Sequence, residues 1–336
     1  MVTLSVMDQS PIPSGSTAAQ ALADTLALAQ EADRLGFRRF WLAEHHNTRS
    51  LAGTAPEVMT ATIAARTSGI RVGSGGVLLT HYSPLKVAEA FRTLEALYPG
   101  RIDLGLGRAD GADAVAVAAL QQDRHAVDEE YPERVADLVG FLDDALAPGH
   151  RYADVRAMPD TQGTPEVWVL GSSSYGADLA ARMGLPFCFA HFVSPRYGRQ
   201  VMAGYRRHFR PSPRCPAPCA SVGVSVICAA TDSEADRLAT SGDVWGLRKE
   251  GAGRGPLLPP EGAEAYPASE VEKELLVQHH ARRFTGAPDK VHAALSDLAT
   301  EFEVDELVVR TVCHDPAARL RSYRLLAEVF SLPRRS

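Results

Sequence analysis

Residues 70–97 read IRVGSGGVLLTHYSPLKVAEAFRTLEAL, a short apolar run followed directly by a helical pattern. The run from Ile70 to Leu79 is rich in Val, Leu and Gly, and it predicts a buried strand. Ser83 and Pro84 then mark a helix start, because proline pre-sets the dihedral angle of the first turn. The apolar residues that follow recur at spacings of three and four: Val87, Phe91, Leu94 and Leu97. This spacing predicts an amphipathic helix whose apolar stripe packs on a sheet.

The same unit of strand and helix repeats along the whole chain. We expect eight strands, at Val2 to Met7, Phe37 to Leu42, Ile70 to Leu79, Ile102 to Leu106, Val167 to Leu170, Phe187 to Phe192, Ser221 to Ala229 and Glu306 to Val309. Eight strands alternating with helices predict a (β/α)8 TIM barrel, and we expect one domain over residues 1–336. A doubly wound open sheet shares this alternation, but no Gly-x-Gly-x-x-Gly dinucleotide fingerprint follows an early strand.

Helix boundaries and loops are marked by local signals. Thr54 with Glu57 three residues on, Ser194-Pro195 and Asp315-Pro316 each predict a helix start. Two segments break the regular pattern. The Pro-containing stretch Cys215 to Cys219 predicts a connection, and residues 251–267, GAGRGPLLPPEGAEAYP, predict a long loop. Such a loop is either functional or a disordered excursion.

The composition is that of an ordinary globular protein, with 336 residues, 45% hydrophobic and 23% charged. A net charge of −6 without long runs of Lys and Arg argues against nucleic-acid and anionic-membrane partners. The five cysteines are scattered and odd in number, which favours free thiols in a reducing compartment. The N-terminus, MVTLSVMDQSPIPSG, lacks the features of a secretion signal, and no apolar run approaches a membrane span. We therefore expect a cytoplasmic protein.

Titratable residues cluster where the predicted strands end, which is where barrels of this kind carry their catalytic groups. Glu44, His45 and His46 follow the second strand, and two imidazoles beside a carboxylate favour catalysis over a structural role. His81 follows the third strand, and we weigh a structural role equally with one in a ligand pocket. Consecutive residues of an extended chain point to opposite faces, so Glu44 to His46 are poorly placed to chelate one ion. We expect no metal.

Two further strand ends predict an anion site. Arg108 follows the fourth strand, where the small Gly105 and Gly107 let a ligand approach the backbone and the guanidinium suits a bidentate contact. After the fifth strand, Gly171-Ser-Ser-Ser-Tyr-Gly176 leads into a helix expected to begin near Ala177. Hydroxyls and bare N–H groups at a helix N-terminus suit a phosphate monoester. Serines also cap helices without a ligand, so the nearby guanidinium is what favours the phosphate.

Five stretches together, in this order, resemble the bacterial-luciferase-like monooxygenases. They are WLAEHH (41–46), GSGGVLL (73–79), HYSPLKVAE (81–89), PGRIDLGLGR (99–108) and HDPAARLRSY (314–323). The resemblance implies a (β/α)8 barrel that accepts reduced FMN from a separate NAD(P)H:flavin reductase and uses O2 to oxygenate a small organic substrate. It also implies a homodimer that pairs through the helices near residues 54–67 and 83–98, and a mobile lid at 251–267.

The resemblance assigns roles to individual residues. His45 matches the family's catalytic histidine, with Glu44 beside it and expected to tune its imidazole. Arg108 and Ser173 match positions that bind the FMN phosphate, with Ser172, Tyr175 and Gly176 as neighbours in that cradle. Gly75-Gly76 matches a non-prolyl cis peptide under the isoalloxazine ring. His46 and His81 are expected in the substrate pocket.

No pattern in the sequence identifies the substrate. Luciferase-like enzymes oxidise aldehydes, alkanesulfonates, terpenes and polyketides, and the Arg-rich, Lys-poor composition favours an aromatic polyketide-type natural product of secondary metabolism. Two alternatives stay open. One is a deazaflavin-dependent oxidoreductase on the same barrel, and the other is a non-catalytic flavin-binding protein, against which the presence of His45 and Arg108 argues.

Overall fold

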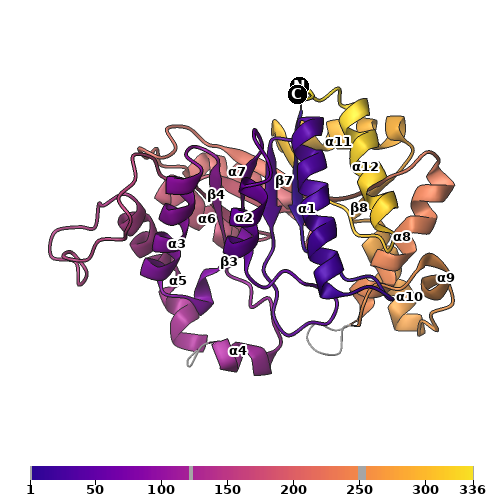
Figure 1. The fold of residues 1–336 in the computed structure, drawn as a ribbon, viewed down its shortest axis with the longest axis horizontal. Coiled ribbons are helices and arrows are strands. Elements are labelled where there is room, and N and C mark those ends of the chain that lie inside the picture. Colours follow the sequence, from indigo (N-terminus) through magenta and orange to yellow (C-terminus); the bar gives the residue numbers. More distant parts are fainter. Residues whose placement is uncertain (1, 121–123, 249–254, 336) are drawn as a thin grey trace.

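The computed structural model describes residues 2–120, 124–248 and 255–335 (Figure 1). Eight parallel strands close into a ring in the order β1-β2-β3-β4-β5-β6-β7-β9, with β9 paired to β1. Their bounds are β1 Thr3–Asp8, β2 Arg39–Leu42, β3 Arg71–Leu78, β4 Ile102–Gly107, β5 Glu166–Gly171, β6 Phe187–Ala190, β7 Ala220–Cys228 and β9 Glu306–Arg310. These are the eight expected strands, each end within two residues of its predicted position, and the (β/α)8 barrel is confirmed.

Helices surround the ring of strands. Their bounds are α1 Ala18–Leu35, α2 Pro56–Ala64, α3 Pro84–Leu97, α4 Ala114–Leu120, α5 Arg124–Leu142, α6 Ser174–Met183, α7 Gly198–His208, α8 Asp232–Leu247, α9 Pro260–Glu264, α10 Glu270–His280, α11 Pro288–Phe302 and α12 Pro316–Val329, with a 3-10 turn at Leu79–His81. In Figure 1 both chain ends lie at the top, and α4, α9 and α10 lie at the bottom. Since β1 starts near the N-terminus, the bottom is the end where the parallel strands finish.

A ninth strand, β8 (Arg283–Gly286), was not predicted. It pairs with β7 from Ser225 to Cys228, whereas β6 pairs with β7 only as far as Gly223. The long β7 thus runs past β6, and β8 pairs with backbone groups that extend beyond the ring. The four residues of β8, RFTG, are too few and too mixed to give a strand pattern.

Two of the expected helix starts are confirmed and two are wrong. Asp315 caps α12 by accepting from the backbone N–H of Ala317, and α3 begins at Pro84 as predicted. Thr54 does not cap α2, because Pro56 occupies the first helical position and makes Ala55 the cap. Ser194-Pro195 does not start α7 either. That helix begins three residues later, after Tyr197 adopts a left-handed φ of 59°.

Other expectations are corrected in part. In the stripe of α3, Val87, Phe91 and Leu94 are buried, but Leu97 is 62% exposed. Of the long loop expected at 251–267, residues 251–254 lie outside the described part. The remainder is ordered by a backbone hydrogen bond from Leu257 to Ile12 (3.0 Å) and by the short helix α9, which starts at Pro260 because two prolines set its first turn.

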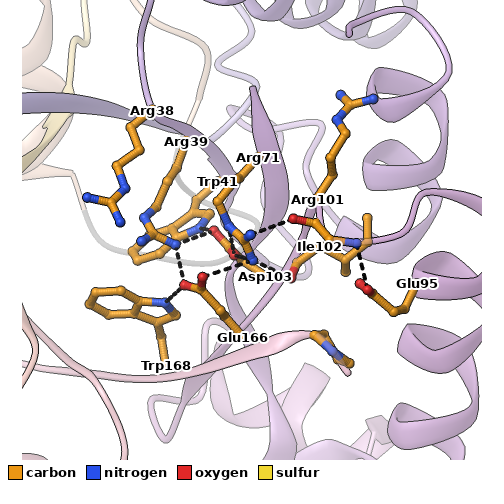
Figure 2. Close-up of polar contacts among 12 residues, drawn as sticks. Arg38, Arg39, Trp41, Arg71, Glu95, Arg101, Ile102, Asp103, Glu166 and Trp168 are labelled. Carbon is orange, nitrogen blue, oxygen red and sulfur yellow. Dashed lines mark hydrogen bonds and ion pairs between the residues drawn. The ribbon is translucent and has the colours of Figure 1, made fainter. Parts of the chain in front are cut away.

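A network of buried charges fills the barrel near the start of the strands (Figure 2). The side chain of Arg39 is 1% exposed, and its guanidinium donates to Asp103 (3.0 Å), Glu166 (2.7 Å) and Glu306 (2.8 Å). These carboxylates hold the pKa of Arg39 above its usual value, against the effect of burial. The indole of Trp41 donates to the same Asp103 (2.8 Å). The network therefore fixes Trp41, whose side chain also lines a cavity at the C-terminal ends of the strands.

Candidate active site

A cavity of about 440 Å³ lies among the C-terminal ends of the strands. Its size is within the range of small-molecule and cofactor sites, about 300–1,000 Å³. Nine of the eleven predicted site residues line it: Glu44, His45, Gly75, Gly76, Arg108, Ser172, Ser173, Tyr175 and Gly176. The two others, His46 and His81, do not line it. Residues at the ends of β2, β3, β4 and β5 thus lie around one cavity.

One end of this cavity is built for an anion. Helix α6 begins at Ser174, three residues before the predicted start, so the N–H groups of its first turn belong to the Ser-rich loop itself. Ser173 is the N-cap, and its hydroxyl makes no capping hydrogen bond. The guanidinium of Arg108 lies over the ring of Tyr175, with its Cζ 4.1 Å from the ring centroid. A cation, hydroxyls and a helix N-terminus on one side of a cavity fit a phosphate monoester.

Two consecutive glycines of β3, Gly75 and Gly76, also line the cavity. The peptide bond from Gly75 to Gly76 is cis, as the resemblance predicts. A Cβ on Gly75 would lie 2.8 Å from the Cβ of Trp41, and one on Gly76 would lie 2.7 Å from the carbonyl oxygen of Gly105. Both distances are too short for a side chain. Packing against β2 and β4 therefore requires glycine at both positions, and these residues present only backbone to the cavity.

His45 is connected to two residues that were not predicted. The side-chain nitrogen of Gln9 lies 3.5 Å from Nε2 of His45, and its oxygen accepts from Nη1 of Arg310 (3.4 Å). A guanidinium can only donate, so the amide oxygen must face Arg310 and the NH2 group must face His45. In this arrangement Nε2 of His45 accepts and carries no proton. Gln9 and Arg310 follow or end the first and last barrel strands, so the strand-end rule could have found them.

The carboxylate of Glu44 bonds Tyr82, Leu78 and His46, and its expected effect on the imidazole of the adjacent His45 stays a prediction. The side chain of Glu44 is 1% exposed, and its carboxylate accepts from the hydroxyl of Tyr82 (2.6 Å) and the N–H of Leu78 (3.0 Å) and contacts Nε2 of His46 (2.7 Å). Burial and the bond to Glu44 hold the pKa of Tyr82 above its usual value. Because neighbouring residues point to opposite sides, Glu44 ties the ends of β2 and β3 together while His45 faces Gln9.

His46 and His81 form part of the supporting structure. Nε2 of His81 hydrogen-bonds the carbonyl of Asp110 (2.8 Å), and the two imidazole rings meet edge to face with centroids 5.9 Å apart. These contacts explain why neither ring lines the cavity. His46 and His81 were expected in the substrate pocket, and neither of them lines this cavity.

The described residues also bear on three other features: metal sites, cysteine thiols and membrane-spanning helices. Among residues 2–120, 124–248 and 255–335, no group of three or more His, Cys, Asp or Glu is arranged to hold a metal ion. The cysteines are free thiols, and burial raises the pKa of Cys188, which lines the cavity, to about 12. Within the same part of the chain, no helix has the length and apolarity needed to cross a bilayer.

Comparison with known proteins gives matches over nearly the full length. The family model described as luciferase-like monooxygenase matches residues 2–311. The N-acetyl-S-alkylcysteine monooxygenase of Bacillus subtilis (strain 168) is 35% identical over 332 residues, covering 98% of each chain. The crystal structure of apo-MsnO8 is 43% identical, covers 100% of both chains and has a TM-score of 0.91.

Two more distant solved structures share the fold alone. One is the FMN complex of the oxygenating constituent of 3,6-diketocamphane monooxygenase from Pseudomonas putida, 19% identical over 100% of each chain with a TM-score of 0.70. The other is an F420-dependent secondary alcohol dehydrogenase with an F420–acetone adduct, 13% identical over 98% of each chain with a TM-score of 0.69.

Proposed function

The chain belongs to the family of luciferase-like monooxygenases, and we propose that it uses reduced FMN and O2 to oxygenate a small organic molecule. We propose further that a separate NAD(P)H:flavin reductase supplies the flavin. The observation that carries this proposal is that Arg108 and the Ser-rich start of α6, a glycine pair and a histidine all line one cavity. Bound reduced FMN supplies the electrons with which O2 is activated.

Arg108 and the loop Ser172 to Gly176 would hold the flavin phosphate, and we call this group of residues the phosphate cradle. The guanidinium gives a charge-assisted contact, and Ser173 offers its hydroxyl together with the N–H groups of the first turn of α6. Gly75 and Gly76 leave room for the ring system beside Trp41. Aromatic and aliphatic residues complete the lining and exclude water, among them Met7, Trp41, Tyr131, Phe192 and Val308.

We assign to His45 the role of general base at Nε2. This nitrogen lines the cavity region shared with Gln9, and the amide of Gln9 presents it with a donor, which favours the unprotonated form. Glu44 has a positioning role, because its carboxylate holds the backbone of Leu78 and the hydroxyl of Tyr82. The substrate group that loses a proton must therefore approach from the side of the cavity where His45 lies.

Anaerobic titration tests the flavin proposal directly. We expect reduced FMN to bind more tightly than riboflavin and than a deazaflavin, and oxygen uptake to follow when a flavin reductase is added. Tighter binding of the deazaflavin, without oxygen uptake, would instead support a hydride-transferring oxidoreductase. That second candidate is favoured by the shared fold with the F420-dependent alcohol dehydrogenase.

The remaining proposals concern localisation, substrate class and oligomeric state. We propose a cytoplasmic enzyme of secondary metabolism whose substrate is an aromatic polyketide-type molecule, which the aromatic lining of the cavity supports. We also propose a homodimer through α2 and α3, supported by the exposed Val58 (60%) and Leu97 (62%) on these helices. Light scattering of the purified protein tests this, since Val58→Asp should shift a dimer toward monomer.

A further inference from the structure

A second cavity of about 340 Å³ adjoins the first. The residues of the phosphate cradle and the glycine pair line only the first cavity, whereas His45 lines both. With FMN in the first cavity, a substrate that reaches His45 therefore lies in the second. The two cavities share four lining residues, which form their boundary: Gln9, His45, Phe192 and Val193.

The second cavity has walls of its own. Apolar side chains reach it from β7, from α8 and from the residues that follow β9: Ile227, Ala239, Trp245 and Val312. Polar residues line it as well, among them Asp243, which is ion-paired with Arg283. An indole beside aliphatic side chains suits an aromatic ligand that carries polar substituents. This lining agrees with the aromatic substrate class proposed above.

The ring of Phe192 lies at the boundary between the two cavities. Phe192 follows β6, and its backbone N–H donates to the carbonyl of Gly223 on β7 (3.3 Å). A Cβ on Gly223 would lie 3.0 Å from Cε1 of the ring, so the ring rests on the backbone of β7. The ring also contacts Arg310, whose Cζ lies 4.4 Å from the ring centroid. Contacts with β7 and with the end of β9 therefore hold the ring in place.

We propose that Phe192 is a specificity-determining residue, and that its ring sets the size of the aromatic substrate that can lie in the second cavity beside His45. Of the four boundary residues, Phe192 alone carries a large apolar ring, and Val193 is 50% exposed. This inference rests on the proposed function. It deepens that function by assigning the substrate to the second cavity and by naming the side chain that limits its size.

Neutral methyl ketones of increasing size test the proposal: acetophenone, 2-acetylnaphthalene and 4-acetylbiphenyl. Each is titrated anaerobically into protein saturated with reduced FMN, and its Kd is divided by that of acetophenone. Phe192→Ala should shift this ratio about tenfold in favour of the larger ketones, the effect of burying one more ring. Phe192→Trp should shift it in the opposite direction. If neither variant changes the ratio, or if no ketone binds to any of the three proteins, the proposal is wrong.

Tryptophan fluorescence reports which cavity is occupied. Trp41 lines the first cavity and Trp245 lines the second. A ketone should quench Trp245, so Trp245→Phe should lose most of the ketone signal and keep the quenching of Trp41 by reduced FMN. A ketone that displaces reduced FMN would occupy the first cavity and overturn the proposal. Absence of any flavin signal, with the ketone signal from Trp245 intact in flavin-free protein, would refute the flavin proposal alone.

Further variants separate substrate size from indirect effects. If Phe192→Ala acted only by releasing Arg310, all three ketones would be affected alike and the ratio would not move. Phe192→Leu should give an intermediate ratio even if Phe192→Ala folds poorly. The control is Phe209→Ala, which removes a half-buried ring after α7 that lines neither cavity. An equal change of the ratio in this control would assign the effect to a general loosening of the fold and overturn the proposal.

Discussion

Nε2 of His45 lies 3.5 Å from the side-chain nitrogen of Gln9, across the ends of the first two barrel strands. The amide can present only its NH2 group there, because its oxygen faces the guanidinium of Arg310. A residue at the end of the last strand thus selects the tautomer of a histidine after the second strand. This relationship makes the protonation state of His45 open to test.

Replacing His45 tests its role as the base. We expect His45→Ala to lower the rate of oxygenation by about 10²-fold or more, because positioned proton transfer contributes about that much. Reduced FMN should bind almost unchanged, since His45 lies away from the phosphate cradle. The rate is measured as substrate-dependent oxygen uptake with an added flavin reductase. Unchanged turnover would remove His45 from the mechanism.

Changing Gln9 tests its effect on the protonation of His45. Gln9→Glu places a carboxylate beside Nε2 of His45, and a nearby negative charge favours the protonated imidazole. Protonated His45 cannot act as a base, so activity should be lost at low pH and the acidic limb of the rate profile should move to higher pH. Gln9→Met removes the amide donor without adding a charge, so it should move the limb in the same direction but less far. A limb that stays in place in Gln9→Glu would show that the side chain at position 9 does not act on His45.

Replacing Arg108 tests the phosphate cradle. Arg108→Met should weaken the binding of reduced FMN by about 10–100-fold, the value of a charge-assisted contact. Riboflavin lacks the phosphate, so its affinity should change little and serves as the internal control. Both affinities come from anaerobic calorimetry. Equal losses for the two flavins would indicate that Arg108 supports the ring and not the phosphate.

The buried network of Figure 2 predicts an effect on stability. Arg39→Met removes the guanidinium that binds buried Glu306 and one of the two that bind buried Asp103, where Arg71 remains. It should reduce the free energy of unfolding by about 3–5 kcal/mol. The control is Arg38→Gln. Its side chain is 49% exposed and lies 3.8 Å from Glu306, so the change should cost less than about 1 kcal/mol. Urea denaturation of both variants checks the difference.

The pH dependence of that stability has a definite sign. Although burial opposes it, Arg39 and Arg71 hold the pKa of Glu166 below its usual value. A carboxylate of this kind stabilises the fold above its unfolded pKa, and the contribution is lost as pH falls through the folded pKa. In Arg39→Met the acid-induced loss should therefore be smaller than in the unchanged protein.

The sequence alone determined the eight strands of the barrel, though not β8, and most of the residues of the candidate site. Periodicity is a local property, and the carboxyl end of a strand can be read from the few residues that follow it. His45, Arg108 and Ser173 were accessible in this way, because a closed parallel barrel brings all strand ends to one face. The glycine pair lies inside β3 and was expected only from the resemblance to the luciferase-like family.

Only the tertiary structure decided which of these residues act on one another. Gln9 and Arg310 are separated by 301 positions, and Arg39 and Glu306 by 267, so no window of sequence contains either pair. Glu44 was expected to act on the adjacent His45, yet it bonds Tyr82, which is 38 residues away. The physical reason is barrel closure: β9 pairs with β1 in a fixed register, and that register sets which distant polar groups can satisfy one another inside the protein.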